Sequence, residues 1–162
     1  MLEIINYTTD TAAQYELGDS DELQSYINDH EGDEIGVSHC NIIAINSLDE
    51  AIEFLDMNEE QHEQLTVISN HYGYSYFSSF DEALEEFENI CYIRIDDADS
   101  VYQMASKLNY ELYLADELCM LLGCSLEAME QLGSYITNDD IAHTIETEYD
   151  YTIVNNTAYI IL

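Results

Sequence analysis

The balance of charges constrains this chain more than any other feature of its sequence. It carries 35 Asp and Glu residues against two basic ones, Arg94 and Lys107, which gives a formal net charge of −33. Contacts to phosphate need lysine and arginine, so such a chain cannot bind nucleic acid or an anionic membrane through its own surface. Most metabolites also require positively charged groups for binding. We therefore expect a protein that is not an enzyme.

The chain is nevertheless expected to fold. Hydrophobic residues make up 47% of it, including 14 Tyr, whereas disordered acidic segments lack apolar and aromatic residues. Ile, Asn and Tyr have A/T-rich codons, and lysine codons are A-rich too, yet there is a single lysine. This bias indicates that positive charge is harmful to the function. A halophilic protein is the alternative explanation of the acidity.

The sequence lacks the common motifs for catalysis, cofactor binding and metal binding. No G-x-S-x-G, Walker loop or G-x-G-x-x-G occurs, so we expect no cofactor. Asp97 and Asp99 resemble the start of an EF-hand loop, but Tyr102 stands where the glycine is needed and Leu108 where the glutamate is needed. We therefore expect no metal site. The four cysteines form no C-x-x-C and are expected to be free thiols.

Targeting signals also bear on where the protein acts. The sequence has no apolar run of bilayer-spanning length and no basic segment followed by an apolar one. We expect a cytoplasmic protein of a bacterial host cell.

Hydrophobic periodicity predicts three small α+β units, at residues 1–45, 46–95 and 96–162. The first holds a strand over 2–8, a helix to about Asp29 and a strand over 34–45. The second is mainly helical and ends in one strand over 89–95. The third is helical, beginning with a helix over 100–113, and it closes in a β-hairpin around Asn155 and Asn156.

Two helix starts in the central unit are nearly identical. Ser47 with Glu50, and Ser79 with Glu82, each fit the S-x-x-E capping box. Apolar residues follow at i, i+3, i+4 and i+7 in both segments, which predicts one inward stripe for each helix. In the second helix the outward residues form an acidic face.

The number of charges is comparable with that of a short DNA duplex. B-DNA carries one negative charge per about 1.7 Å of its axis, so 33 charges correspond to roughly 55 Å. A compact globule of this length would be only about 40 Å across. An elongated chain of small units would lower the repulsion and improve the match. The expected fold class is therefore α+β, an elongated chain of three small α+β units with a strongly acidic surface and a DNA-mimic shape.

The carboxylates expected to take the place of phosphates lie on the predicted helices and turns of the second and third units. We call them the candidate carboxylates: Asp81, Glu82, Glu85, Glu86, Glu88, Asp96, Asp97, Asp99, Asp116, Glu117, Glu127, Glu130, Asp139, Asp140, Glu146 and Glu148.

The order of elements over roughly residues 35–162 resembles ArdA, the antirestriction DNA-mimic family. The likeness rests on the S-L-D-E-A segment from Ser47, the F-S-S-F-D-E-A segment from Phe77 and the apolar strand from Asn89. In the last unit it rests on Ser125-Leu126 opening a helix, and on the acidic helix that begins near Asp139 and leads into the hairpin.

The resemblance implies a protein from a phage or mobile element that dimerises into a long curved body. Such a protein occupies the DNA groove of a type I restriction-modification enzyme and blocks it without catalysing any reaction. Two alternatives stay open. One is a DNA mimic that inhibits another DNA-handling system of the host, such as a CRISPR effector. The other is an acidic chaperone of a basic DNA-binding protein.

Overall fold

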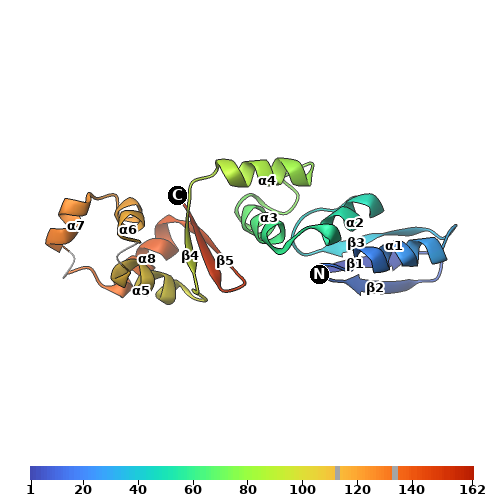
Figure 1. Cartoon of the computed structure of the whole chain (residues 1–162), viewed down its shortest axis with the longest axis horizontal. Coiled ribbons are helices and arrows are strands. Elements are labelled where there is room, and N and C mark those ends of the chain that lie inside the picture. Colours follow the sequence, from blue (N-terminus) through green and yellow to red (C-terminus); the bar gives the residue numbers. More distant parts are fainter. Residues whose placement is uncertain (112–113, 133–134) are drawn as a thin grey trace. The chain divides into compact units, whose positions relative to one another are not determined.

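The structure is a computed structural model that describes residues 1–111, 114–132 and 135–162, without the side chains of Glu130 and Leu132. Among these residues the fold is α+β, with eight helices and two three-stranded antiparallel sheets. The described chain divides into two compact units (Figure 1), which we call unit 1 (residues 1–88) and unit 2 (residues 89–162).

Unit 1 combines one sheet with four helices. Its elements in chain order are β1 (Leu2–Asn6), β2 (Thr11–Tyr15), α1 (Ser20–Asp29), β3 (Ile35–Cys40), α2 (Leu48–Asp56), α3 (Glu59–Tyr72) and α4 (Phe80–Asn89). Strand β1 lies between β2 and β3 and pairs antiparallel with both. Because side chains alternate along a strand, Leu2 and Ile4 of β1 are buried on the same face. Helix α2 packs against α1 and β3.

Strand β2 was not predicted from the sequence. Its residues TAAQY contain one large apolar side chain, Tyr15, which is buried, whereas three of the other four residues are exposed. The strand forms because its backbone pairs with β1 from Leu2↔Tyr15 to Asn6↔Thr11. At the edge of a sheet, backbone pairing of this kind needs little apolar side-chain content.

Unit 2 combines the second sheet with four further helices. Its elements in chain order are β4 (Tyr92–Asp96), α5 (Val101–Tyr110), α6 (Ala115–Leu121), α7 (Leu126–Leu132), α8 (Asn138–Glu148), β5 (Asp150–Val154) and β6 (Thr157–Ile161). The strand order is β4-β6-β5, so the last strand of the chain is the central one. The core joins this sheet to α5, α6 and α8 through residues including Ile93, Met104, Leu108, Leu118, Ile141 and Ile160.

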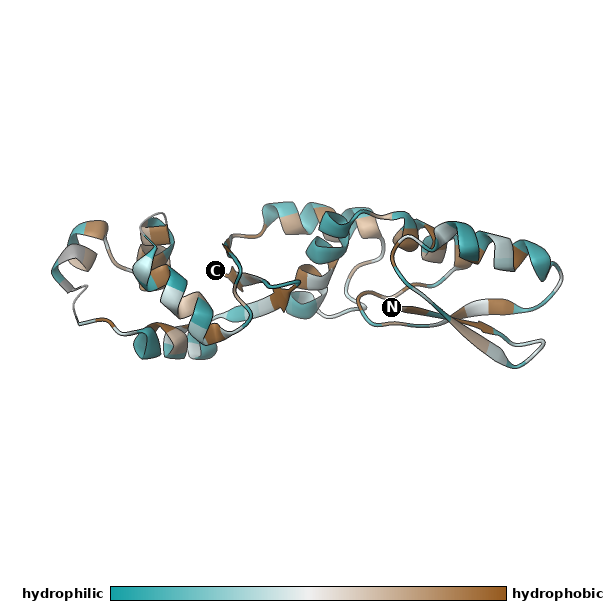
Figure 2. Cartoon of the chain, turned by 60° about the horizontal axis from the view of Figure 1, so that its bottom comes forward, coloured by the Kyte–Doolittle hydropathy of each residue, from teal (hydrophilic) through white to brown (hydrophobic). Residues whose placement is uncertain are grey.

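The helices have the amphipathic character that their periodicity predicts. Figure 2 shows hydrophobic and hydrophilic residues alternating along the helices of both units. Helix α4 buries Phe80, Ala83 and Phe87, three of its four predicted inward residues. In α2, Phe54 is as fully buried as Leu55, although it lies beside the predicted stripe rather than in it. The expected end of the helix over 100–113 lies outside the described residues.

The division into units differs from the expected three. Helix α2, expected to open a central unit, packs against α1 and β3 on the other side of the expected boundary. The strand expected to close that unit is β4, and it pairs with β6 from Tyr92↔Ile161 to Asp96↔Thr157. Backbone pairing over five residues places this strand in unit 2. No helix of the described residues is long and apolar enough to span a membrane.

Candidate functional site

The candidate carboxylates are shared between the two units. Five of the sixteen lie on a single helix of unit 1, α4: Asp81, Glu82, Glu85, Glu86 and Glu88. The other eleven belong to unit 2, in the β4–α5 segment, α6, α7 and α8. Helices α4, α6 and α8 bury apolar residues on one side, so most of their carboxylates project toward solvent. The side chain of Glu130, on α7, lies outside the described residues.

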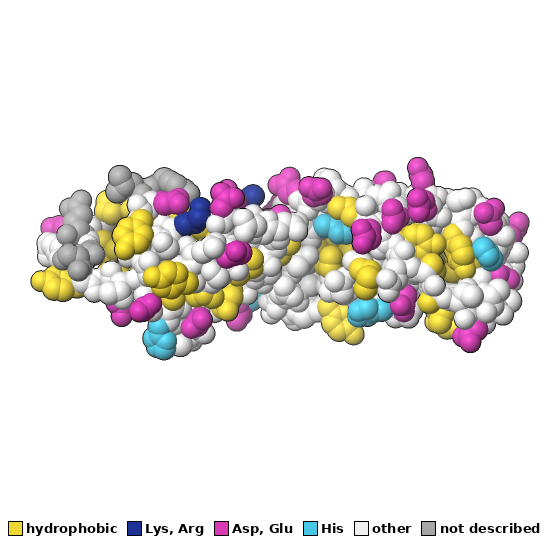
Figure 3. Space-filling model, turned by 90° about the horizontal axis from the view of Figure 1, so that it is seen from below, with side chains coloured by type: hydrophobic (Ala, Val, Ile, Leu, Met, Phe, Trp, Pro, Cys, Tyr) yellow, Lys and Arg dark blue, Asp and Glu magenta, His cyan; other side chains and the backbone are white. Residues whose placement is uncertain are grey.

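Most candidate carboxylates whose side chains are described are exposed. Of these fifteen, thirteen are exposed and only Glu86 and Glu117 are partly buried. Figure 3 shows acidic side chains spread over the visible face as separate groups rather than as one continuous patch. The many exposed charges together produce a negative field around the protein.

Two of the candidate carboxylates are also structural. Glu82 accepts hydrogen bonds from the Ser78 hydroxyl at 2.6 Å and from the Ser78 backbone N–H at 3.0 Å. These bonds, the hydroxyl's first, hold the pKa of Glu82 below its ordinary value, because they stabilise the ionised form. Hydrogen bonds from the hydroxyl and backbone N–H of Thr137 lower the pKa of Asp140 in the same way. Both groups therefore keep their charge to a lower pH.

The predicted capping boxes form in part. Ser47 and Ser79 each accept a hydrogen bond from the backbone N–H three residues on, as expected. The glutamates, however, reach the residue before the cap: Glu50 accepts from the Asn46 N–H and Glu82 from the Ser78 N–H. Complete boxes instead begin α3 and α8, where asparagine and threonine are the caps.

Both basic residues are engaged by carboxylates. The Arg94 Nε lies 3.0 Å from Asp96 Oδ1, and the Arg94 guanidinium stands over the Tyr159 ring at 5.9 Å. The Lys107 Nζ lies 3.5 Å from Glu111 Oε1, one helical turn away. These are the chain's two Lys and Arg residues, so both of its permanent cations are paired within unit 2.

The two partly buried candidates have distinct surroundings. Glu86 accepts a hydrogen bond from the Tyr72 hydroxyl at 2.7 Å, and this bond raises the pKa of Tyr72. Glu117 has one carboxylate oxygen that is buried without a hydrogen-bond partner. Neither side chain is as exposed to solvent as those of the other described candidates.

Among the described residues no group of three or more His, Cys, Asp or Glu could hold a metal ion. Cys40, Cys91, Cys119 and Cys124 are free thiols. Burial, followed by the neighbouring Cys124, raises the pKa of Cys119, which keeps that thiol protonated.

Sequence reasoning missed one feature with binding potential, a small pocket in unit 1 lined by two glutamates of α2 and by the start of α4. Of its carboxylates only Asp81 was a candidate. Glu50 and Glu53 lie three residues apart in the sequence, which places them on one helix face, and this spacing was the available signal.

Comparisons with known proteins give no relative. The chain matches no family model, no curated protein and no solved structure.

Proposed function

We propose that the protein is a DNA-mimic inhibitor that occupies the DNA-binding cleft of a type I restriction-modification enzyme and blocks restriction and modification. One observation carries the proposal: thirteen of the fifteen candidate carboxylates with described side chains are exposed, while Arg94 and Lys107 are both paired with carboxylates. The resemblance of residues 35–162 to the ArdA family supports the choice of target.

Electrostatics supplies the mechanism. A DNA-binding cleft is lined with lysine and arginine that contact phosphates. An array of fixed carboxylates meets the same groups, and attraction between the opposite charges speeds the encounter of the two proteins. No bond is made or broken, so inhibition is competitive with DNA. The partner is a DNA-binding protein complex of the host cell, and the proposed inhibitor contacts neither nucleic acid nor membrane.

The decisive experiment measures competition. Purified type I enzyme is loaded with a labelled duplex carrying its recognition site, and the protein is titrated in while the labelled DNA released is followed. We expect complete displacement, reversed by excess unlabelled duplex. Affinity for the enzyme should fall as salt rises, because charges at the surface of both partners become screened. Simultaneous binding of DNA and protein to the enzyme would overturn the proposal.

Two multiple variants test which carboxylates act. The first changes five exposed candidates to amides: Asp116, Glu127, Asp139, Glu146 and Glu148. The control changes five exposed carboxylates outside the candidate set: Glu16, Asp21, Glu31, Glu59 and Glu60. Both lose the same charge. We expect the first to weaken displacement strongly and the control to weaken it much less. Equal weakening would show that net charge, rather than the candidate carboxylates, determines binding.

Single substitutions should behave differently from the multiple variant. A phosphate-like field is a sum of many weak terms, each on the scale of an exposed ion pair, about 0.2–1 kcal/mol. Glu146→Gln alone should therefore change the inhibition constant by less than about fivefold. A large loss from this one amide would indicate a single hot spot instead of a distributed field.

The same assay separates the alternative targets. Displacement of DNA from a CRISPR effector, with no effect on the type I enzyme, would identify a DNA mimic of another defence system. If the protein binds a histone-like protein and keeps that histone-like protein soluble without DNA, it would be identified as an acidic chaperone.

The proposal includes an elongated arrangement of small units and a homodimer, as the ArdA resemblance implies. A compact chain of this length has a radius of gyration of about 15 Å. Small-angle scattering with light scattering should give a dimer mass and a radius well above that of a compact dimer. A spherical particle would contradict the elongated form.

A further inference from the structure

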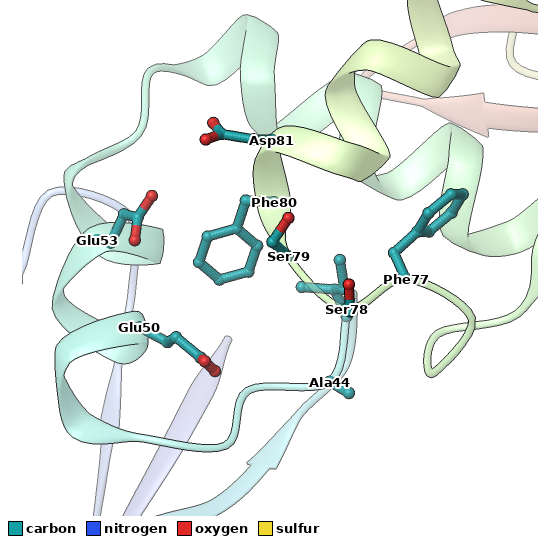
Figure 4. Close-up of a pocket in the computed structure, with 9 residues that line it drawn as sticks. Ala44, Glu50, Glu53, Phe77, Ser78, Ser79, Phe80 and Asp81 are labelled. Carbon is teal, nitrogen blue, oxygen red and sulfur yellow. The ribbon is translucent and has the colours of Figure 1, made fainter.

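Unit 1 contains a pocket of about 210 Å³ between α2, the segment after β3 and the start of α4. Its inner wall is apolar, because Ile43, Phe77 and Phe80 are all buried. Figure 4 shows the Phe80 ring in the middle of the pocket, with Glu50, Glu53 and Asp81 arranged around it. The pocket therefore combines an aromatic surface with three carboxylates and lies entirely within one unit.

The carboxylates of this pocket are available to a ligand to different degrees. Glu50 is held in place because one of its oxygens accepts the Asn46 N–H at 2.7 Å. Within the described part of the chain, the carboxylates of Glu53 and Asp81 form no hydrogen bond or ion pair with the protein. No Lys, Arg or His lines the pocket. Its charge is therefore not compensated from within.

We propose that this pocket receives an arginine side chain of the partner protein. Sites for small molecules and cofactors have volumes of about 300–1,000 Å³, so a pocket of about 210 Å³ suits a single side chain better. Guanidinium is planar, stacks on aromatic rings and binds carboxylates through two parallel hydrogen bonds. Its planar head would stack on the Phe80 ring, among Glu50, Glu53 and Asp81.

This inference rests on the proposed function and makes it more specific. A partner with a DNA-binding cleft is rich in arginine, and a desolvated aromatic pocket makes an arginine a focus of binding energy. The pocket would thus add one geometrically defined anchor to a field that is otherwise diffuse. It also predicts that Glu50 and Glu53 of α2 belong to the interface, although neither is a candidate carboxylate.

The test uses the full-length protein and a defined probe. N-acetyl-arginine amide is titrated into isotope-labelled protein, and backbone amide shifts are followed by NMR. The neutral isostere N-acetyl-citrulline amide and the corresponding lysine amide are titrated in parallel. We expect saturable shifts confined to residues 43–53 and 77–81, and affinity for the citrulline amide at least about tenfold weaker, because charge-assisted hydrogen bonds are lost. The lysine amide should bind more weakly than the arginine amide.

Two double variants of equal charge supply the control. Glu53→Gln with Asp81→Asn removes the two unpaired carboxylates of the pocket. The control, Glu60→Gln with Glu88→Gln, also removes one carboxylate from the first turn of a helix and one from a later turn, but both lie outside the pocket. The first pair should abolish the localised shifts and the second should retain them. Shifts spread over the whole surface, an equal response to citrulline, or an equal loss in both variants would overturn the proposal.

The DNA-displacement assay keeps the two proposals separate. Arginine binding without DNA displacement would overturn the proposed function and leave the pocket in place. The opposite result is also informative. If the protein does not bind the arginine probe, and Glu53→Gln with Asp81→Asn leaves DNA displacement unchanged, the arginine pocket is overturned. The proposal of a DNA mimic then remains in place.

Discussion

Asn6 is a buried polar residue on β1, and its side chain holds together the start of unit 1. Its carbonyl oxygen accepts the N–H groups of Thr8 and Thr9, at 3.0 and 3.1 Å, and its Nδ2 donates to Asp33 at 2.8 Å. A single side chain thus fixes the turn toward β2 and ties it to the segment before β3. Burial is tolerated because both polar atoms of the side chain form hydrogen bonds.

We predict that Asn6→Ala lowers the free energy of unfolding by about 1–3 kcal/mol, because it leaves hydrogen-bonding groups without partners. Asn28→Ala is the control, since Asn28 is exposed and its hydrogen bond with Gln24 is long, at 3.3 Å. That change should stay within about 0.5 kcal/mol. Urea denaturation measures both. Equal midpoints for the two variants would contradict the role assigned to Asn6.

His62 is a half-buried histidine of α3 in unit 1. Its Nε2 donates to the Phe54 carbonyl at 2.6 Å, and the two rings lie 4.2 Å apart. Burial lowers the pKa of His62 below its ordinary value of 6.5, and the hydrogen bond to Phe54 opposes this only in part. The unfolded chain therefore binds a proton more readily than the folded one, and protonation favours unfolding.

From this direction we predict that the contribution of His62 to stability is complete above pH 6.5 and is lost as the pH falls through its lower folded pKa. Thermal melts between pH 7.5 and 5 would show the loss, and His62→Gln, which keeps an N–H donor, should reduce it. The exposed His143→Gln serves as the control. An identical pH profile for the wild type and His62→Gln would refute the prediction.

At the scale of elements, the β5–β6 hairpin shows how two residues determine a sheet. Asn155 and Asn156 have φ values of 48° and 66°, the left-handed conformation that a two-residue type I′ turn requires. Asparagine adopts this conformation more readily than other residues with a Cβ atom. Because β6 is the central strand, the turn sets the register of β5 against it and thereby completes the sheet.

We predict that Asn156→Gly is neutral or slightly stabilising, whereas Asn156→Ala costs about 1–2 kcal/mol, because alanine pays the full steric cost of the left-handed conformation. Chemical denaturation of the whole protein, monitored by circular dichroism, distinguishes the two variants. Equal stability of the alanine and glycine variants would mean that the turn does not control the hairpin.

For the whole molecule, self-repulsion is the dominant electrostatic term. With 33 net charges and both cations already paired, the exposed carboxylates repel one another in the folded state more strongly than in an expanded one. Raising the ionic strength from about 0.01 M to about 0.15 M shortens the screening length from about 30 Å to about 8 Å. Screening should therefore stabilise the folded chain.

We predict a higher Tm in the higher salt. A gain of about 1 kcal/mol corresponds to a rise of roughly 4–8 °C for units of this size. Sodium chloride and choline chloride at equal ionic strength should act alike, since screening depends on ionic strength and not on the identity of the cation. A Tm that does not change with salt would mean that the carboxylates are too far apart to interact.

The sequence alone predicted the features that depend on neighbouring residues. The helices α2 and α4 follow from apolar periodicity and from the caps Ser47 and Ser79, and the hairpin follows from Asn155 and Asn156. The net charge is counted directly from the sequence. The outward direction of most candidate carboxylates is predicted as well, because an amphipathic helix that buries one stripe exposes the rest.

Tertiary structure alone decided the features that depend on distant residues. Strand β2 has little apolar content and forms because β1 offers its backbone a partner. Strand β4 belongs to unit 2 because β6, some 65 residues later, pairs with it. The pocket around Phe80 exists because α2 and the start of α4 meet. Local signals cannot specify such contacts, since hydrogen bonds between strands and packing between helices join segments whose separation leaves no periodic trace in the sequence.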